Sequence, residues 1–236
     1  MTAASSATSA SAASAVTGAS GRQPIDPRVG CSTISLRRLP LDEALRKIAG
    51  AGFAEIDLGA LPGVCDHVPF PLPGERVGPI AGLVRDSGLR VRTVNADVGP
   101  LDDPALTPST VAARLEPLVR LAELTGAPSV TLPCGAQEGP AHEGPSHGGP
   151  PRGDEDAAIR AVAGALAAAE RVVAPAGLAL LVEAPHFSRL CHDLSRALRL
   201  REELAGTPVR LVLDTSHVVA GGGDCVAAAR AFGDRL

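Results

Sequence analysis

Short runs of valine, leucine and isoleucine alternate along the chain with longer segments in which apolar residues recur every three or four positions. This alternation is typical of parallel β-strands that are joined by crossover helices. It predicts an α/β fold with six strands, at residues 30–36, 54–59, 89–95, 129–133, 178–183 and 209–214.

The intervening segments have the spacing and the end signals of amphipathic helices. Leu41, Leu45 and Ile48 fall on one helical face after Pro40. A later helix is predicted to end at Gly126, and its core face is expected to carry four leucines: Leu115, Leu118, Leu121 and Leu124. Three aspartates stand where further helices should begin and are predicted as N-caps: Asp154, Asp193 and Asp224.

Six βα units are therefore predicted, and they form one domain that spans residues 28–236. A closed (β/α) barrel has eight such units and typically about 250 residues. We therefore expect a TIM (β/α) barrel that is truncated after about six units, with about two more units following Leu236 in the parent protein.

Two segments depart from this pattern. Residues 1–27 consist mainly of alanine, serine and threonine, and they are predicted to be a disordered tail because they offer little apolar surface to bury. The segment from Gly135 to Gly153 contains two EGPxH elements, which end at His142 and His147. It is longer than most ordered loops, and we expect a mobile insertion whose histidines are poorly placed to hold a metal.

Composition narrows the range of partners. The net charge is −4, the arginines are not gathered into a basic stripe, and the chain has four phenylalanines but no tryptophan or tyrosine. A dedicated nucleic-acid binder is therefore not expected, and ligand recognition should be polar or metal-based. Five cysteines without a CxxC pair indicate the reduced thiols of a cytoplasmic protein. No apolar run approaches the roughly 18 residues of a membrane span.

The clearest chemical signal lies at the ends of the last two predicted strands. Glu183 follows five apolar residues and Asp214 follows three, and a histidine stands three positions after each acid, at His186 and His217. Ligands of parallel α/β folds bind at the carboxyl ends of the strands, so Glu183, Asp214 and His217 are expected to share a divalent-metal site. The alternative is that Glu183 and Asp214 cap helices or pair with Arg189 and Arg210. For His186 two interpretations stay open, a substrate contact and a structural histidine.

The segments GLALLVEAPH and VRLVLDTSHVVAGGGD carry a family resemblance. They resemble strands five and six of the sugar phosphate isomerase/epimerase family, whose xylose isomerase-like TIM barrel is shared with the family 2 apurinic endonucleases. The resemblance implies that Glu183 and Asp214 are metal ligands, that His217 is a ligand or a substrate contact, and that Glu183 shuttles a proton. It also implies a further histidine from strand seven and a second glutamate from strand eight, which the six predicted units do not include.

Other candidates leave two interpretations open. His67, in the CDH sequence after the second strand, is either a substrate contact at the same mouth or a loop histidine without such a role. Asn95, at the end of the third strand, either binds a sugar hydroxyl or only terminates the strand. Asp57 either points to the mouth or is an ordinary strand residue.

Together with these residues, the resemblance implies a divalent-metal-dependent sugar or sugar phosphate isomerase or epimerase that works by ene-diolate proton transfer. The ligand types suit manganese, magnesium, cobalt or zinc. The alternatives are a phosphodiester hydrolase like the apurinic endonucleases, which would act on abasic DNA, and a catalytically silent barrel fragment or binding module. The expected partner is a small sugar or sugar phosphate and not a membrane, and homo-oligomer formation is left open.

Overall fold

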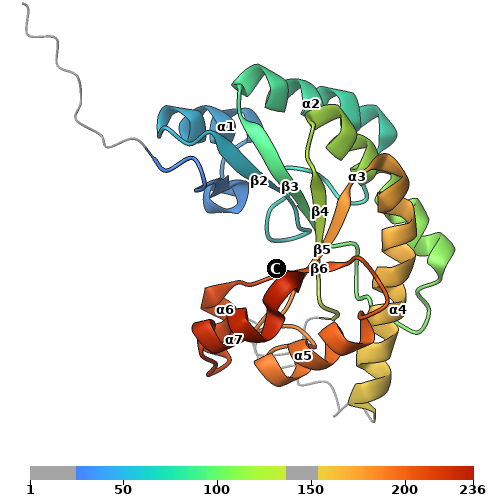
Figure 1. The fold of residues 1–236 in the computed structure, drawn as a ribbon. Coiled ribbons are helices and arrows are strands. Elements are labelled where there is room, and N and C mark those ends of the chain that lie inside the picture. Colours follow the sequence, from blue (N-terminus) through green and yellow to red (C-terminus); the bar gives the residue numbers. More distant parts are fainter. Residues whose placement is uncertain (1–24, 137–153) are drawn as a thin grey trace, which may run out of the picture.

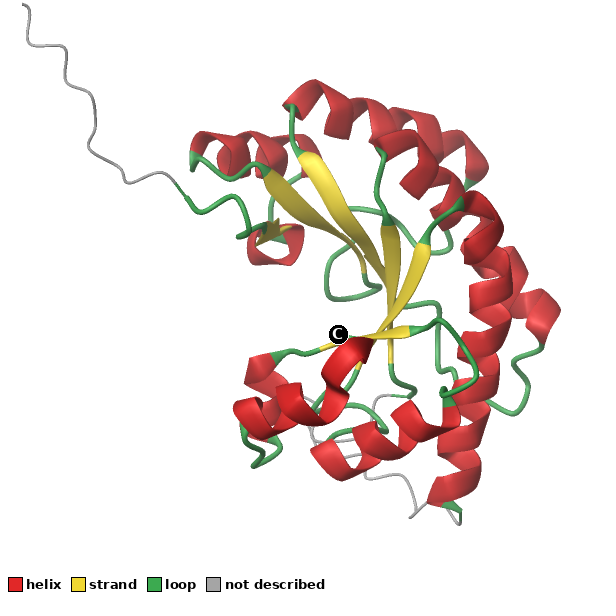
Figure 2. Ribbon diagram, viewed as in Figure 1, coloured by secondary structure: helices red, strands yellow, loops and turns green. Residues whose placement is uncertain are grey.

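Each β-strand pairs in parallel with the next strand along the chain, which gives a six-stranded sheet in the order β1-β2-β3-β4-β5-β6 (Figure 2). The computed structural model describes residues 25–136 and 154–236. The strands are β1 (Cys31–Ser32), β2 (Glu55–Ala60), β3 (Arg90–Ala96), β4 (Ser129–Pro133), β5 (Ala179–Glu183) and β6 (Arg210–Val212). The six-stranded parallel sheet confirms the predicted α/β fold and its six βα units.

Helices occupy the connections and follow the outer face of the curved sheet (Figure 1). They are α1 (Leu41–Gly50), α2 (Gly74–Ser87), α3 (Pro108–Thr125), α4 (Glu155–Val173), α5 (Leu194–Glu203), α6 (Thr215–Ala220) and α7 (Cys225–Phe232). Three short 3-10 turns complete the described elements: η1 (Thr33–Leu36), η2 (Ala174–Ala176) and η3 (Gly233–Arg235). Because all the strands run in the same direction, their carboxyl ends meet at one edge of the sheet.

The hydrophobic core lies between the sheet and the helices. Outward-facing strand residues such as Leu58, Leu132 and Val182 are fully buried against the helices. In α3, Leu115, Leu118 and Leu121 are also fully buried, whereas Leu124 is 41% exposed, so the prediction of four core leucines is wrong at its last member. Steps of three residues fall short of the 3.6-residue helical turn, and nine residues after Leu115 the chain has reached the opposite side of the helix.

The predicted helix ends are confirmed. Asp154, Asp193 and Asp224 each accept a hydrogen bond from the backbone N–H three residues later, at 2.9, 2.9 and 2.7 Å. Gly126 ends α3 in the left-handed conformation, with φ of 69°. Such a conformation favours glycine, because other residues meet steric strain there.

The central strands match their predicted ranges to within one residue, whereas the first and the last do not. The first strand was predicted over residues 30–36, but β1 ends at Ser32, whose hydroxyl accepts a hydrogen bond from the Ile34 N–H and caps η1. The last strand was predicted to end at Asp214, but β6 ends at Val212 and Asp214 caps helix α6. In both places a side-chain oxygen satisfies backbone donors locally and the chain leaves the sheet.

Three further expectations concern the rest of the chain. Residues 1–24 of the predicted tail and residues 137–153 of the predicted insertion lie outside the described residues. All five cysteines are free thiols, and Cys65, Cys134 and Cys191 are buried, as expected. Among the described helices, none has both the length and the apolar character that crossing a membrane requires.

Candidate metal centre

Three potential metal ligands meet at the carboxyl ends of β5 and β6. Glu183 is the last residue of β5 and is in register with Val212, the last residue of β6. His186 follows in the loop after β5, and His217 lies in the first turn of α6. The short helix α6 brings the His217 side chain back toward Glu183.

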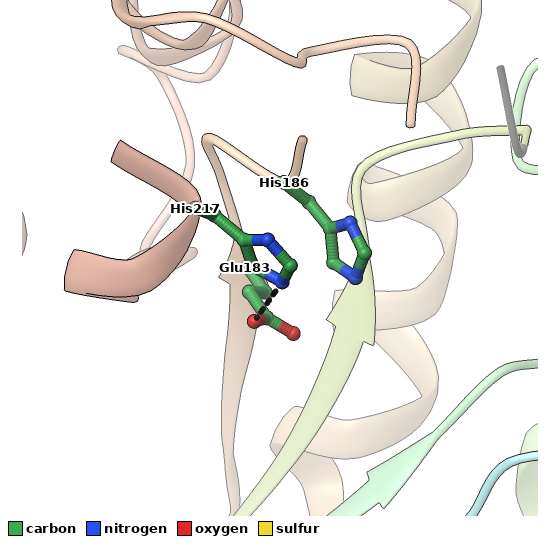
Figure 3. Close-up of side chains that lie close together, drawn as sticks. All are labelled: Glu183, His186 and His217. Carbon is green, nitrogen blue, oxygen red and sulfur yellow. Dashed lines mark ion pairs between the residues drawn. The ribbon is translucent and has the colours of Figure 1, made fainter. Parts of the chain in front are cut away.

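The three side chains face one another closely (Figure 3). His217 Nε2 lies 3.6 Å from Glu183 Oε1, and the two imidazole rings stack with their centroids 3.9 Å apart. One ligand atom from each residue can be chosen so that all three lie within 4.8 Å of one another. Ligands bound at about 2.0–2.2 Å from one ion are at most about 4.4 Å apart. A small inward movement would therefore let these residues hold a divalent cation.

Backbone hydrogen bonds close the loop that carries His186. The His186 N–H donates to the Cys191 carbonyl at 2.9 Å, and the Arg189 N–H donates to the His186 carbonyl at 2.8 Å. The Leu190 N–H donates to Ala136 O at 3.1 Å, which ties this loop to the chain that follows β4. These contacts fix the backbone position from which the imidazole reaches Glu183.

The contact between the two loops depends on a glycine. Gly135 follows β4 with φ of 103°, and a Cβ atom placed on it would lie 3.0 Å from the Leu190 Cβ and 3.2 Å from a methyl group of Val162. The backbone conformation and the close approach both disfavour a side chain at this position. Gly135 therefore allows the loop after β4 to pack against the loop that carries His186.

Asp214 positions the helix from which His217 projects. Its Oδ1 accepts hydrogen bonds from the backbone N–H groups of Ser216 and His217, at 2.7 and 3.3 Å. Burial raises the pKa of the Asp214 carboxyl, but these hydrogen bonds outweigh that effect and the pKa is lowered. Its Oδ2 lies 3.9 Å from His217 Nε2. The capping alternative is thus present in the structure, and the role of Asp214 as a metal ligand stays a prediction.

The electrostatic environment shifts the pKa values of two of the three candidate ligands, Glu183 and His186. Burial, together with the negative charges of Asp214 and Asp57, raises the pKa of Glu183 to about 7. Burial and the nearby positive charges of His217 and Arg189 lower the pKa of His186 to about 4. Near neutral pH, Glu183 can therefore exchange a proton, and His186 is a neutral imidazole with a lone pair available for a metal ion.

A cavity of about 930 Å³ adjoins these residues and brings together five of the six predicted site residues. They are Asn95, Glu183, His186, Asp214 and His217. Asn95 Nδ2 donates a hydrogen bond to Asp57 Oδ2 at 3.2 Å, and Asp57 also lines the cavity. A cavity of this volume is in the range of small-molecule sites.

His67, for which a substrate contact and a loop position without such a role were both left open, is not among the residues that line this cavity. Its Nδ1 lies 3.3 Å from the Cys65 thiol sulfur, and its Nε2 lies 2.9 Å from the Leu39 carbonyl oxygen. A carbonyl only accepts hydrogen bonds, so Nε2 carries a proton and both ring nitrogens have protein partners. These contacts favour the structural alternative for His67.

Sequence reasoning gave little weight to an ion pair in the same cavity. Arg189 had been considered only as a possible partner of the strand-end acids, yet its Nη2 lies 2.6 Å from Asp97 Oδ2. Both residues line the cavity. The sequence could have indicated this pair, because both residues follow strand-end candidates. Asp97 stands two residues after Asn95, at the end of β3, and Arg189 stands three residues after His186.

Comparisons with known proteins agree with the fold. The model of the family described as the xylose isomerase-like TIM barrel matches residues 45–236. A sequence search of the curated proteins finds no match.

Several solved structures are similar in fold. The 3-keto-D-glucoside 4-epimerase YcjR from E. coli has 18% identity and a TM-score of 0.62, over 88% of this chain and 75% of that chain. An AP endonuclease of family 2 from Brucella melitensis has 16% identity and a TM-score of 0.67, over 89% of this chain and 77% of that chain. The IOLI protein, whose structure contains a zinc atom, has 11% identity and a TM-score of 0.60, over 86% of this chain and 68% of that chain. At these identities the similarity establishes the fold alone.

Proposed function

Because the chain belongs to the family of xylose isomerase-like TIM barrels, we propose that it is a divalent-metal-dependent isomerase or epimerase. In this proposal it moves a proton between adjacent carbon atoms of a small polyhydroxy carbonyl compound. The observation that carries the proposal is the position of Glu183. This carboxyl, whose pKa is raised to about 7, lies at the wall of a cavity next to two imidazoles.

The metal would be held by Glu183, His186 and His217. When bound there, a divalent cation would supply a Lewis acid that polarises a substrate carbonyl. Two imidazoles and one carboxylate suit zinc, cobalt or manganese better than magnesium, which prefers oxygen ligands. The zinc in a structure of the same fold, the IOLI protein, supports this choice.

Glu183 would move the proton. A general acid or base works best when its pKa is close to the working pH, because it then both accepts and returns a proton readily. In the metal-free protein, burial and neighbouring acids give Glu183 this property, and Arg189 limits the shift by partly offsetting their negative charge. His186, which is neutral at this pH, would bind the metal without competing for the proton.

Proton exchange with solvent tests this proposal. A panel of aldoses and ketoses is incubated in deuterium oxide with the protein and manganese or zinc, and the carbon-bound hydrogens are followed by proton NMR. We expect one sugar to lose a hydrogen next to its carbonyl and an isomer or epimer to form. The Glu183→Gln variant should lose this activity, whereas Glu203→Gln, which changes an exposed glutamate of α5, should retain it.

Two results would count against the proposal. One is that no sugar of the panel exchanges a carbon-bound hydrogen with either manganese or zinc, and the other is that Glu183→Gln exchanges it as fast as the wild type. Nicking of abasic DNA by the wild type, lost in Glu183→Gln, would instead assign the same centre to phosphodiester hydrolysis.

A further inference from the structure

Asp57 is a half-buried acid whose one part in the proposed reaction is to raise the pKa of Glu183. It lies in the middle of β2 and lines the same cavity as Glu183. Its Oδ2 accepts the hydrogen bond from Asn95, whereas its Oδ1 is buried and has no hydrogen-bond partner among the described residues. A buried carboxylate oxygen without a partner destabilises the fold.

Nearby cations do not offset this cost. The two arginines that line the cavity are each paired with another acid: Arg92 with Glu55 at 2.5 Å, and Arg189 with Asp97 at 2.6 Å. Burial raises the pKa of the Asp57 carboxyl, although the hydrogen bond from Asn95 and the neighbouring Ser32 hydroxyl oppose this effect. The charge of Asp57 also raises the pKa of Glu183. A group that is unfavourable for the fold and faces a cavity is expected where function requires it.

We propose that Asp57 and Asn95 form a subsite that binds a hydroxyl-bearing, uncharged part of the substrate, such as a vicinal diol. A hydroxyl group both donates and accepts hydrogen bonds, so it can donate to the Asp57 carboxylate and accept from the Asn95 amide. An ammonium group or a metal ion would satisfy the carboxylate but could not accept the amide hydrogen. The pairing of an acid with an amide therefore favours a polyol over a cation.

The neighbouring strands give this subsite a defined place. Ser32 on β1 is in register with Asp57, and Thr131 on β4 is in register with Asn95, and both also line the cavity. The side-chain torsion next to the carboxylate of an aspartate is broad, so a small rotation brings the buried Oδ1 of the half-buried Asp57 toward the cavity. A ligand bound here would meet hydroxyl, amide and carboxylate groups from four adjacent strands.

The subsite lies across the cavity from the candidate metal centre, since Asp57 and Asn95 are on β2 and β3 whereas Glu183 and His217 belong to β5 and α6. This inference depends on the proposed function only because the subsite and the proposed reaction use the same cavity. A substrate that presents its reacting carbons to Glu183 would place its more distant hydroxyls at Asp57. The subsite would thus select the uncharged polyol part of the substrate and orient it for proton transfer.

The Asp57→Asn variant tests the proposal, because it removes the charge while keeping the shape of the side chain. The control is Asp86→Asn, which changes an exposed aspartate of α2. Three quantities are measured: the Tm at pH 7 in EDTA, the Kd for manganese, and the binding of D-fructose, D-xylose and xylitol by titration calorimetry and saturation-transfer NMR. The wild type should bind at least one of these polyols, and Asp57→Asn should weaken that binding at least tenfold. Its Tm should be equal to or higher than that of the wild type, and its manganese Kd should stay within threefold.

Four outcomes would contradict the proposed subsite. A Tm that falls by several degrees in Asp57→Asn would show that the carboxylate is structural, and displacement of the polyol by putrescine would indicate a cation site. The other two outcomes are unchanged polyol binding in Asp57→Asn and no polyol binding by the wild type. Failure of the proposed function looks different. Polyol binding that depends on Asp57, in a protein that never exchanges a carbon-bound hydrogen, would keep the subsite and refute the isomerase.

Discussion

Arg189 and Asp97 form an ion pair, with 2.6 Å between Nη2 and Oδ2, that joins the loop after β5 to the end of β3. Arg189 Nη1 also donates to the Gly135 carbonyl at 3.2 Å, so one guanidinium connects the loops that follow three adjacent strands. The exposed fractions of the two side chains are only 15% and 21%. An ion pair with so little solvent contact is screened less than a surface pair and holds its partners in one arrangement.

The first prediction concerns this ion pair. Arg189→Gln should weaken manganese binding by about tenfold or more, because groups that orient metal ligands commonly contribute this much to affinity. The physical reason is that the loop carrying His186 loses its contacts with β3 and β4. Titration calorimetry measures the change, and Arg160→Gln, which removes an exposed arginine that pairs with Asp154, is the matched control. An unchanged manganese affinity in Arg189→Gln would show that the loop is fixed by its backbone hydrogen bonds alone.

The second prediction concerns the pH dependence of stability without metal. The pKa of Glu183 is raised in the folded protein from 4.5 to about 7, so its contribution to stability is lost as the pH rises through this window. The pKa of His186 is lowered from 6.5 to about 4, so its contribution is lost as the pH falls through the corresponding window. The two effects oppose each other. Together, these residues should therefore change the free energy of unfolding of the wild type little between about pH 4.5 and 6.5.

Single variants should separate the two slopes. In EDTA, the free energy of unfolding of Glu183→Gln should rise with pH over this window relative to the wild type, and that of His186→Gln should fall. Each slope should be at most about 1.4 kcal/mol per pH unit, the value for one proton. Urea unfolding at several pH values measures both. Parallel curves for the wild type and the two variants would contradict the assigned pKa shifts.

The third prediction compares how much two leucines of α3 contribute to stability. Leu115→Ala should destabilise the protein by about 2–5 kcal/mol, because it leaves a cavity in the core between α3 and the sheet. Leu124→Ala should change stability by less than about 0.5 kcal/mol, because that side chain is 41% exposed. Urea unfolding of the two variants compares them directly. Similar losses in both would mean that α3 is rotated from its position in the structure.

The sequence predicted the central strands well because each is buried on its helix-facing side and bounded by turn or cap residues. The same pattern failed at Ser32 and Asp214, where apolar neighbours favoured a strand but a side-chain oxygen capped the following turn. Apolar periodicity reports on burial and does not detect a competing local hydrogen bond. The edges of the sheet were therefore predicted less accurately than its centre.

The candidate site was predicted in part for a similar reason. Glu183 and His217 follow from the rule that parallel strands present their ligands at their carboxyl ends. His186 was left open, because its position depends on the contacts of its loop with Cys191 and Ala136, which no local pattern encodes. His67 was also left open, because sequence alone could not show that Cys65 and the Leu39 carbonyl contact both of its ring nitrogens.

Metal binding by Glu183, His186 and His217 is the central claim, and calorimetric titration of the apoprotein with manganese and with zinc tests it most directly. The wild type should bind one ion, and an ion concentration of 100 times the Kd should stabilise it by about 2.7 kcal/mol in urea unfolding. The double variant Glu183→Gln, His186→Gln should keep its fold and lose both the binding and the stabilisation, while Glu203→Gln should retain both. Equal binding and equal stabilisation in the double variant and the wild type would contradict the account.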